Sequence, residues 1–454
     1  MSLSANEKVK NGKLGIGEKV SYGLGDCAAN IYVGLGGTFL TGFYTDTAGI
    51  AAGAIATMML VTRVFDGITD LMMGAVVDKT KSRFGKARPW ILWTAPLMML
   101  GLISLFTVPM SLGAGGKLLY AYITYFIMNC IVYTANNLPY NALLSRMTLD
   151  VQERASTASL RFIMNSIVTI IINAVTPQLV VTIGWNKIAF IYGAIEFVLL
   201  IICFLGTKEH IGAQVDGRVK VDNVPLKVSV PAVLKNKYFY LQALLFTSLY
   251  VGVVSSGSLG YYYFNSVIGD LRLMSLTSLA SIPTIIVNFF VPGLVKKIGK
   301  RRLMMAGCVL MAVGSFIIGI ADKNVAVLMV GSIIKGAGMG PIMSGIFALT
   351  SDIVDYGEWK TGIRSEGLIN SCTSFGMKVG IGLGSAVAGW ILAFGGYEGT
   401  LQIQSESAIN AIKFGYGYLG VILAIACFII LAFMNIDKYL GTIQTELSAK
   451  HEVN

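Results

Sequence analysis

Three ionised side chains interrupt the otherwise apolar stretch from Met58 to Met73, namely Arg63, Asp66 and Asp70. A charge at the depth of a lipid bilayer costs roughly 3 kcal/mol or more unless it is paired or hydrated, so such residues indicate a functional site. On a helix, steps of three and four residues place all three on one face. That face should look into a protein interior or a water-filled cavity, where a small cation would complete the charge balance.

The two acids have the chemistry of a cation site. Carboxylate oxygens are the hard ligands that Na+ needs, and two close carboxylates can alternatively share a proton. We therefore predict a cation site at Asp66 and Asp70, with Arg63 as a helper and the Thr69 hydroxyl as a further oxygen. The coupling ion can be Na+ or H+, with Li+ as a third candidate. The alternative is a structural role, in which the acids form a salt bridge that only ties helices together.

Asp26, in the first apolar run, is the other deep carboxylate. A carboxylate that accepts two hydrogen bonds suits a ligand rich in hydroxyl groups, with an arginine donating from the far side and an aromatic ring against an apolar face of the ligand. We predict Arg161 as that donor. The other residues predicted to line this substrate site are Asn30, Tyr133, Thr134 and Asn137.

Bulk composition indicates an all-α integral membrane protein. The chain has 454 residues, of which 55% are hydrophobic and 13% charged, and apolar runs of about 20 residues recur along its length. Its net charge of +11 lies in short loops between apolar runs, so we expect no nucleic-acid partner. The cysteines form no C-x-x-C pair, both histidines are in polar segments, and no phosphate-binding loop occurs. We expect no cofactor, no resident metal and no enzyme activity.

Twelve spans are predicted, in two sets of six. They cover roughly residues 20–45, 50–77, 88–110, 118–146, 157–184, 186–206, 237–265, 274–295, 303–321, 324–352, 365–393 and 412–435. We expect an N-terminal six-helix bundle over 1–206, a central cytoplasmic loop over 207–236, a C-terminal six-helix bundle over 237–437 and a cytoplasmic tail over 438–454.

The distribution of cations orients these spans. Of the 35 lysines and arginines, 26 fall on the side that holds both termini and the central loop, and 5 fall on the opposite side. By the positive-inside rule, both termini are expected in the cytoplasm of a multi-pass cell-membrane protein. The glycine-and-cation turn after span 2, from Gly74 to Arg88, is echoed after span 8, from Gly293 to Arg301. Two related bundles with a substrate site between them are typical of alternating-access transporters.

Several stretches are similar to a known family. They are GEKVSYGLGDCAANI, FYTDTAG, RVFDGITDLMMGAVVDKTKSRFGKARPW, NNLPYNAL, SDIVDYGEWKTGIRSEG and YLGTIQTEL, spanning about residues 17 to 447. They resemble the major facilitator superfamily, and within it the glycoside-pentoside-hexuronide:cation symporter branch that includes the melibiose permease. The resemblance implies inward sugar transport driven by Na+, Li+ or H+, with the cation served by the acids of the second span.

The resemblance also assigns a role to Lys378, which lies at the middle of its span. It implies that this lysine faces the acids of the second span and competes with the cation for them. This chain departs from melibiose-type members at three positions. It has Asn137 where they carry an acid in the fourth span, Asn141 in place of an aromatic residue nearby, and Leu71 in place of a proline in the second span. These departures weaken the expectation of a galactoside, and leave β-glucosides, xylosides and glucuronides open.

Charged residues near the cytoplasmic ends suggest a gate. We predict ion pairs that close the inner side, formed by Asp78, Arg83, Arg88, Asp352, Asp355 and Glu358. The alternative function is a Na+-coupled lysolipid carrier of a related branch, which the cluster of sugar-type hydrogen bonders disfavours. The expected partners are a sugar or glycoside and the lipid bilayer, without an obligate protein partner.

Overall fold

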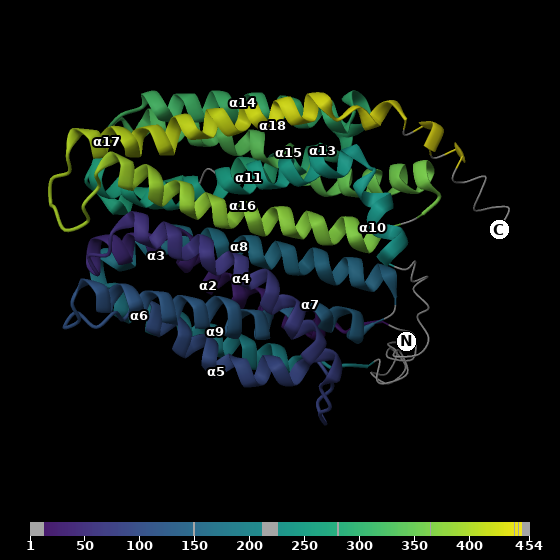
Figure 1. The fold of residues 1–454 in the computed structure, drawn as a ribbon, viewed down its shortest axis with the longest axis horizontal. Coiled ribbons are helices and arrows are strands. Elements are labelled where there is room, and N and C mark those ends of the chain that lie inside the picture. The colour runs from purple at the N-terminus through teal and green to yellow at the C-terminus, as the bar shows by residue number, and fades with distance from the viewer. Residues whose placement is uncertain are drawn as a thin grey trace. The chain divides into compact units, whose positions relative to one another are not determined.

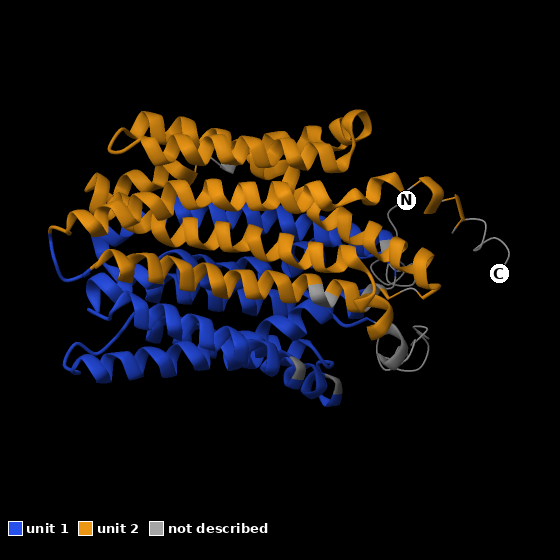
Figure 2. Cartoon of the chain, turned by 45° about the horizontal axis from the view of Figure 1, so that its top comes forward, with its two compact units in different colours: residues 1–220, 398–402 blue, residues 221–397, 403–454 orange. Residues whose placement is uncertain are grey.

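The chain is helical throughout the part that the structure describes. The computed structural model describes residues 13–148, 150–210, 226–278, 281–363, 365–439, 441–443 and 445–446, and no strand occurs among them (Figure 1). Residues 1–12, half of the predicted central loop (211–225) and the last residues of the predicted tail lie outside these ranges. The chain divides into two compact units, residues 1–220 with 398–402 and residues 221–397 with 403–454 (Figure 2).

Unit 1 contains the helices of the first six predicted spans. Their bounds are α2 Ile16–Thr38, α3 Leu40–Gly42, α4 Ala52–Lys79, α5 Arg88–Leu105, α6 Ala114–Phe126, α7 Thr134–Met147, α8 Val151–Ile183 and α9 Trp185–Gly206. Two π-helical segments, η1 Phe43–Thr47 and η2 Ile127–Tyr133, continue α3 and join α6 to α7.

Unit 2 contains the helices of the other six spans. Their bounds are α10 Leu226–Leu234, α11 Lys237–Tyr262, α12 Met274–Thr277, α13 Ser281–Ile298, α14 Lys300–Ile320, α15 Val325–Thr361, α16 Glu366–Gly395, α17 Glu406–Lys413 and α18 Leu419–Phe433. The π-helical segments η3 Tyr263–Ile268 and η6 Phe414–Tyr418 follow α11 and α17. One part of the predicted central loop, α10, is helical.

Ten helical segments among the described residues are long and apolar enough to cross a membrane. Each overlaps one of the twelve predicted spans, and the first two spans are missing from the ten. Their helices α2 and α4 have 23 and 28 residues, which is sufficient length. They are less apolar because α2 carries Asp26 and α4 carries Arg63, Asp66 and Asp70. The two helices that fall short are therefore the ones that carry the predicted sites.

Capping carboxylates mark where two of the helices begin. The Asp150 side chain accepts hydrogen bonds from the backbone of the first turn of α8, at 2.8 and 2.9 Å. The start of α5 is capped by the carboxylate of Glu209, which lies in a distant part of the sequence. It accepts hydrogen bonds from the backbone N–H groups of Lys86, Ala87 and Arg88 at 2.8 to 3.1 Å. Gly85 precedes this turn with φ +104°, a conformation that favours glycine.

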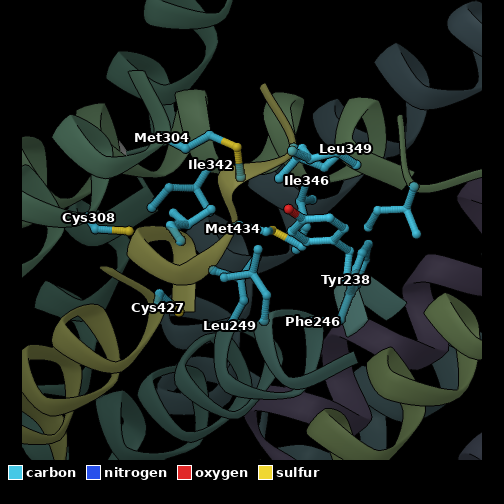
Figure 3. Packing of buried hydrophobic residues seen from close by; sticks show 14 of the residues in the cluster. Tyr238, Phe246, Leu249, Met304, Cys308, Ile342, Ile346, Leu349, Cys427 and Met434 are labelled. Carbon is cyan, nitrogen blue, oxygen red and sulfur yellow. The ribbon is translucent and has the colours of Figure 1, made fainter. Parts of the chain in front are cut away.

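Close helix contacts hold unit 2 together. Buried apolar side chains of α11, α14, α15 and α18, including Leu249, Cys308, Ile342 and Cys427, form its core (Figure 3). Helix α15 approaches α14 so closely that a Cβ added at Gly338 would lie 2.5 Å from the carbonyl oxygen of Gly307. Small residues permit this approach, which replaces the hydrophobic effect as the source of helix association within a bilayer.

Candidate functional site

The predicted cation site lies on α4, facing the start of α7. Asp66 is 4% exposed and Asp70 is half-buried. The Thr134 hydroxyl oxygen lies 3.2 Å from Oδ1 of Asp66 and 3.3 Å from Oδ1 of Asp70, so it touches both carboxylates. Arg63 reaches Oδ2 of Asp66 at 3.5 Å, a long ion pair. Three of the predicted cation residues and one hydroxyl from another helix therefore form one cluster, which we call the acid cluster.

The Thr134 hydroxyl makes contacts that the sequence-based assignment does not include. Thr134 is predicted to line the substrate site, but its hydroxyl contacts the acids of α4. The reason lies in η2, which ends at Tyr133: a π-helical turn holds an extra residue, and one residue rotates the following helix by about 100°. The face that Thr134 presents thus depends on a local irregularity that periodicity does not reveal.

The hydroxyl of Thr69 has a different surrounding. It donates to backbone carbonyl oxygens of its own helix, that of Asp66 at 3.1 Å and that of Phe65 at 3.3 Å. Its proton is therefore used within α4, and only the oxygen lone pairs could serve a cation. Its predicted role stays a prediction.

A second polar cluster surrounds Asp26 on α2, which is 8% exposed. Arg161 of α8 donates from Nη2 to Oδ1 of Asp26 at 2.9 Å, the length of a charge-assisted hydrogen bond. Asn165, one turn further along α8, donates from Nδ2 to the other carboxylate oxygen at 2.5 Å. The carboxylate is thus held by two side chains of one helix, and we call this group the Asp26 cluster.

Arg161 and Asp26 are in direct contact, and the prediction that the two hold a substrate between them stays a prediction. Two buried opposite charges within reach of each other pair, because their mutual attraction offsets part of the cost of desolvating both. Asn30, which is predicted to line the substrate site, donates from its side-chain amide to the backbone carbonyl of Asp26 at 3.0 Å.

Two tyrosines complete the surroundings of Arg161. Tyr22 and Tyr140 stack with ring centroids 4.7 Å apart, and the guanidinium lies 5.1 Å from the Tyr140 ring. Arg161 also donates to the Tyr22 hydroxyl at 3.2 Å. Sequence reasoning missed Tyr22, Tyr140 and Asn165. The spacing from Arg161 to Asn165 is a helical turn and was the one available signal.

A chain of side chains on α7 connects the two clusters. Arg161 donates to Oδ1 of Asn141 at 2.9 Å, and Asn141 in turn donates to Oδ1 of Asn137. Asn137 then donates to the Tyr133 hydroxyl at 2.5 Å, whose ring lies 5.1 Å from that of Tyr32 on α2. Tyr133 is adjacent to Thr134 of the acid cluster. The η2–α7 segment therefore carries contacts to both clusters.

Three of the predicted gate residues, Arg83, Arg88 and Asp352, have contacts within their own units. Arg88 donates to the carbonyl oxygen of Phe204 at 2.6 Å, and Arg83 lies 4.7 Å from the ring of Phe84. In unit 2, Asp352 pairs with Lys300 at 2.6 Å. Asp355 and Glu358 follow on α15 at three-residue steps, and the side chain of Asp78 lies outside the described part. Lys378 lies on α16 of unit 2. The gate and the role of Lys378 stay predictions.

Comparisons with known proteins cover nearly the whole chain. A family model described as "MFS/sugar transport protein" matches residues 21–438. The isoprimeverose transporter of Lactiplantibacillus pentosus is 32% identical over 96% of this chain and 91% of its own length. The inner membrane symporter YicJ of Escherichia coli K12 is 29% identical over 89% and 88%. The crystal structure of the nucleoside transporter NupG, 15% identical, superposes with a TM-score of 0.62 over 93% of this chain and 99% of that one, which indicates a shared fold.

Proposed function

Because the chain belongs to the MFS/sugar transport protein family, in its glycoside-pentoside-hexuronide:cation symporter branch, we propose that it carries a sugar or glycoside into the cell together with a cation. The chain is a multi-pass membrane transporter and not an enzyme. The name of the L. pentosus relative supports a sugar substrate, and a lysolipid cargo has less support. Alternating access between two states supplies the transport step.

The acid cluster is the proposed cation site. Its support is the Thr134 hydroxyl, which lies within 3.3 Å of both carboxylates and so adds a hydroxyl oxygen to the carboxylate oxygens. Carboxylate and hydroxyl oxygens suit Na+, and the same two acids can hold a shared proton. Na+ and H+ therefore both remain coupling ions of this proposal. Lys378 is the proposed competitor of the cation for these acids.

The Asp26 cluster is the proposed sugar-binding site. A carboxylate and a guanidinium together offer the acceptors and donors that sugar hydroxyls require. In the proposal, the sugar hydroxyls bridge or replace the 2.9 Å contact between Arg161 and Asp26. Asn165 keeps the carboxylate oriented while this exchange takes place, because it holds the oxygen that Arg161 does not.

Coupling is proposed to run through the η2–α7 segment. Thr134 contacts the acids of α4, and Tyr133, Asn137 and Asn141 lead from there to Arg161. A cation that draws Thr134 toward the acids shifts the same segment that positions Arg161. The two ligands then raise each other's affinity by the same factor, as thermodynamic linkage requires.

Counterflow in proteoliposomes tests this function. The purified chain is loaded with unlabelled glycosides, β-glucosides, xylosides and glucuronides among them, and exchange of labelled glycoside is followed with and without Na+ at two pH values. We expect one glycoside class to exchange, with a rate that rises with Na+ or with acidity. Absence of exchange for every sugar under every condition would refute the proposal.

A further inference from the structure

Lys335 carries a positive charge in the interior of unit 2 that the transport cycle proposed above does not use. It lies on α15, and its Nζ donates to the Ser256 hydroxyl of α11 at 2.8 Å. This bond ties α15 to α11, but a neutral hydroxyl does not balance the charge of the lysine. Among the described residues no carboxylate pairs with Lys335. The next acid along α15, Asp352, is 17 residues away, about 25 Å at 1.5 Å per residue.

A second polar group at the same place is left unsatisfied. The hydroxyl of Ser315 on α14 is completely buried and has no hydrogen-bond partner among the described residues. A Cβ added at Gly420 of α18 would lie 2.6 Å from this hydroxyl oxygen and 4.0 Å from Nζ of Lys335. The glycine thus marks a point where both groups converge. Buried polar groups are ordinarily paired, so an unpartnered hydroxyl beside an unbalanced ammonium indicates a missing acceptor.

We propose that Lys335, Ser256 and Ser315 bind a monovalent anionic group inside unit 2. The ammonium has three N–H donors, and Ser256 accepts one of them. An anion beside Gly420 would accept from Nζ and from Ser315 together, which satisfies the hydroxyl and neutralises the charge.

The anionic group has two sources with the same chemistry. One is a free halide, for which chloride is the probe. The other is the carboxylate of an acidic sugar substrate, and this source rests on the proposed sugar transport. Two experiments distinguish these sources: a binding arm, in which chloride is varied without sugar, and a transport arm, in which sugars are exchanged without chloride.

In the binding arm, thermal unfolding of the purified full chain is measured at constant Na+ while chloride replaces methanesulfonate. If the ion is free, the melting temperature of the wild type rises with chloride and saturates. Lys335→Gln should abolish this rise, and Ser315→Ala should raise the half-saturating chloride about tenfold, as expected for loss of one hydrogen bond to an ion. Lys297→Gln removes an exposed lysine of α13 and is the matched control.

In the transport arm, counterflow of methyl β-glucoside is compared with that of methyl β-glucuronide in methanesulfonate. If the anion belongs to the substrate, Lys335→Gln and Ser315→Ala reduce glucuronide exchange at least about tenfold relative to glucoside. If chloride does not stabilise the wild type and neither variant changes the preference between the two glycosides, the anion site is refuted. If no glycoside exchanges at all, the symporter proposal fails, and the binding arm still decides the anion site.

Discussion

At the scale of single residues, the two buried aspartates of the proposed sites in unit 1 are held by specific neighbours. Asp26 has Arg161 and Asn165, while Asp66 has Thr134 and the longer contact to Arg63. Removing one member of a buried ion pair commonly costs about 3–5 kcal/mol, because the other charge is left uncompensated. Substitutions that keep shape and polarity therefore test function more cleanly than alanine does.

Asp70→Asn should abolish concentrative uptake while sugar exchange or binding survives. The amide keeps the shape of the side chain but removes the charge that holds a cation or proton. Accumulation of labelled sugar against its gradient in proteoliposomes measures the effect. Asp322→Asn, which neutralises an exposed acid paired with Lys413 at 2.5 Å, is the control and should accumulate sugar normally. Full accumulation by the Asp70 variant would remove this acid from the cation site.

Thr134→Val should weaken apparent cation affinity by about 10-fold or more, since a hydrogen bond to an ionised group contributes about 1.5–3 kcal/mol. Valine is isosteric but has no oxygen for the acids or the ion. The half-saturating Na+ concentration, or the pH midpoint, of counterflow measures the loss. Thr134→Ser keeps the hydroxyl and should stay within a few-fold of the wild type. Equal behaviour of the two variants would argue for a packing role alone.

Asn165→Ala should raise the KM for sugar about tenfold with a smaller change in kcat, because the Asp26 carboxylate loses the donor that orients it. Zero-trans uptake kinetics separate the two parameters. Asn173→Ala on the same helix, whose amide donates to the carbonyl of Thr169 at 3.0 Å, is the matched control. A variant that lost kcat alone would contradict a positioning role in substrate binding.

At the scale of elements, irregular and small-residue segments decide the contacts. The π-helical segment η2 sets the direction of Thr134, and glycines set the distance between α14 and α15. Small residues such as these glycines let membrane helices approach each other closely.

Gly338→Ala should therefore destabilise unit 2. The added Cβ would lie 2.5 Å from the carbonyl oxygen of Gly307 and 2.7 Å from the backbone nitrogen of Met311, and backbone atoms cannot give way as a side chain can. Overpacking of this kind costs about 1–3 kcal/mol. Thermal unfolding in detergent measures it, with Gly293→Ala as the control because no atom lies within 4 Å of its added Cβ. Equal melting temperatures for the two variants would contradict the contact.

At the scale of the whole molecule, the chain is a polytopic bundle protein whose two compact units each contain their own set of polar residues. The Asp26 and acid clusters belong to unit 1. Lys378, the proposed competitor of the cation, belongs to unit 2, so the proposed cycle needs groups from both units. The distribution of cations predicts which ends of the helices face the cytoplasm.

Cysteine labelling tests that orientation. We expect a membrane-impermeant maleimide added to intact cells to label Lys323→Cys, on the predicted outer side, and to spare Lys81→Cys until the membrane is permeabilised. Both positions are exposed on the protein, so any difference in their labelling in intact cells reflects the side of the membrane on which each lies. The unsubstituted chain is the background control, since five of its native cysteines are buried. The reverse labelling pattern would invert the predicted topology.

The sequence by itself determined the membrane class, the approximate positions of the helices and the acids of the second span. These features depend on hydropathy and on charge along one helix, which are local properties of the chain. It also identified Asp26 and Arg161 as a pair of interest, because ionised residues within apolar spans are costly wherever they occur.

Only the tertiary structure decided which residues meet. It assigned Thr134 to the acids of α4, brought Arg161 into direct contact with Asp26, and added Asn165, Tyr22 and Tyr140 around them. Such contacts depend on the rotation of one helix about its axis relative to the next. A single π-helical turn changes that rotation by about 100°, and nothing in the spacing of residues along one helix records it.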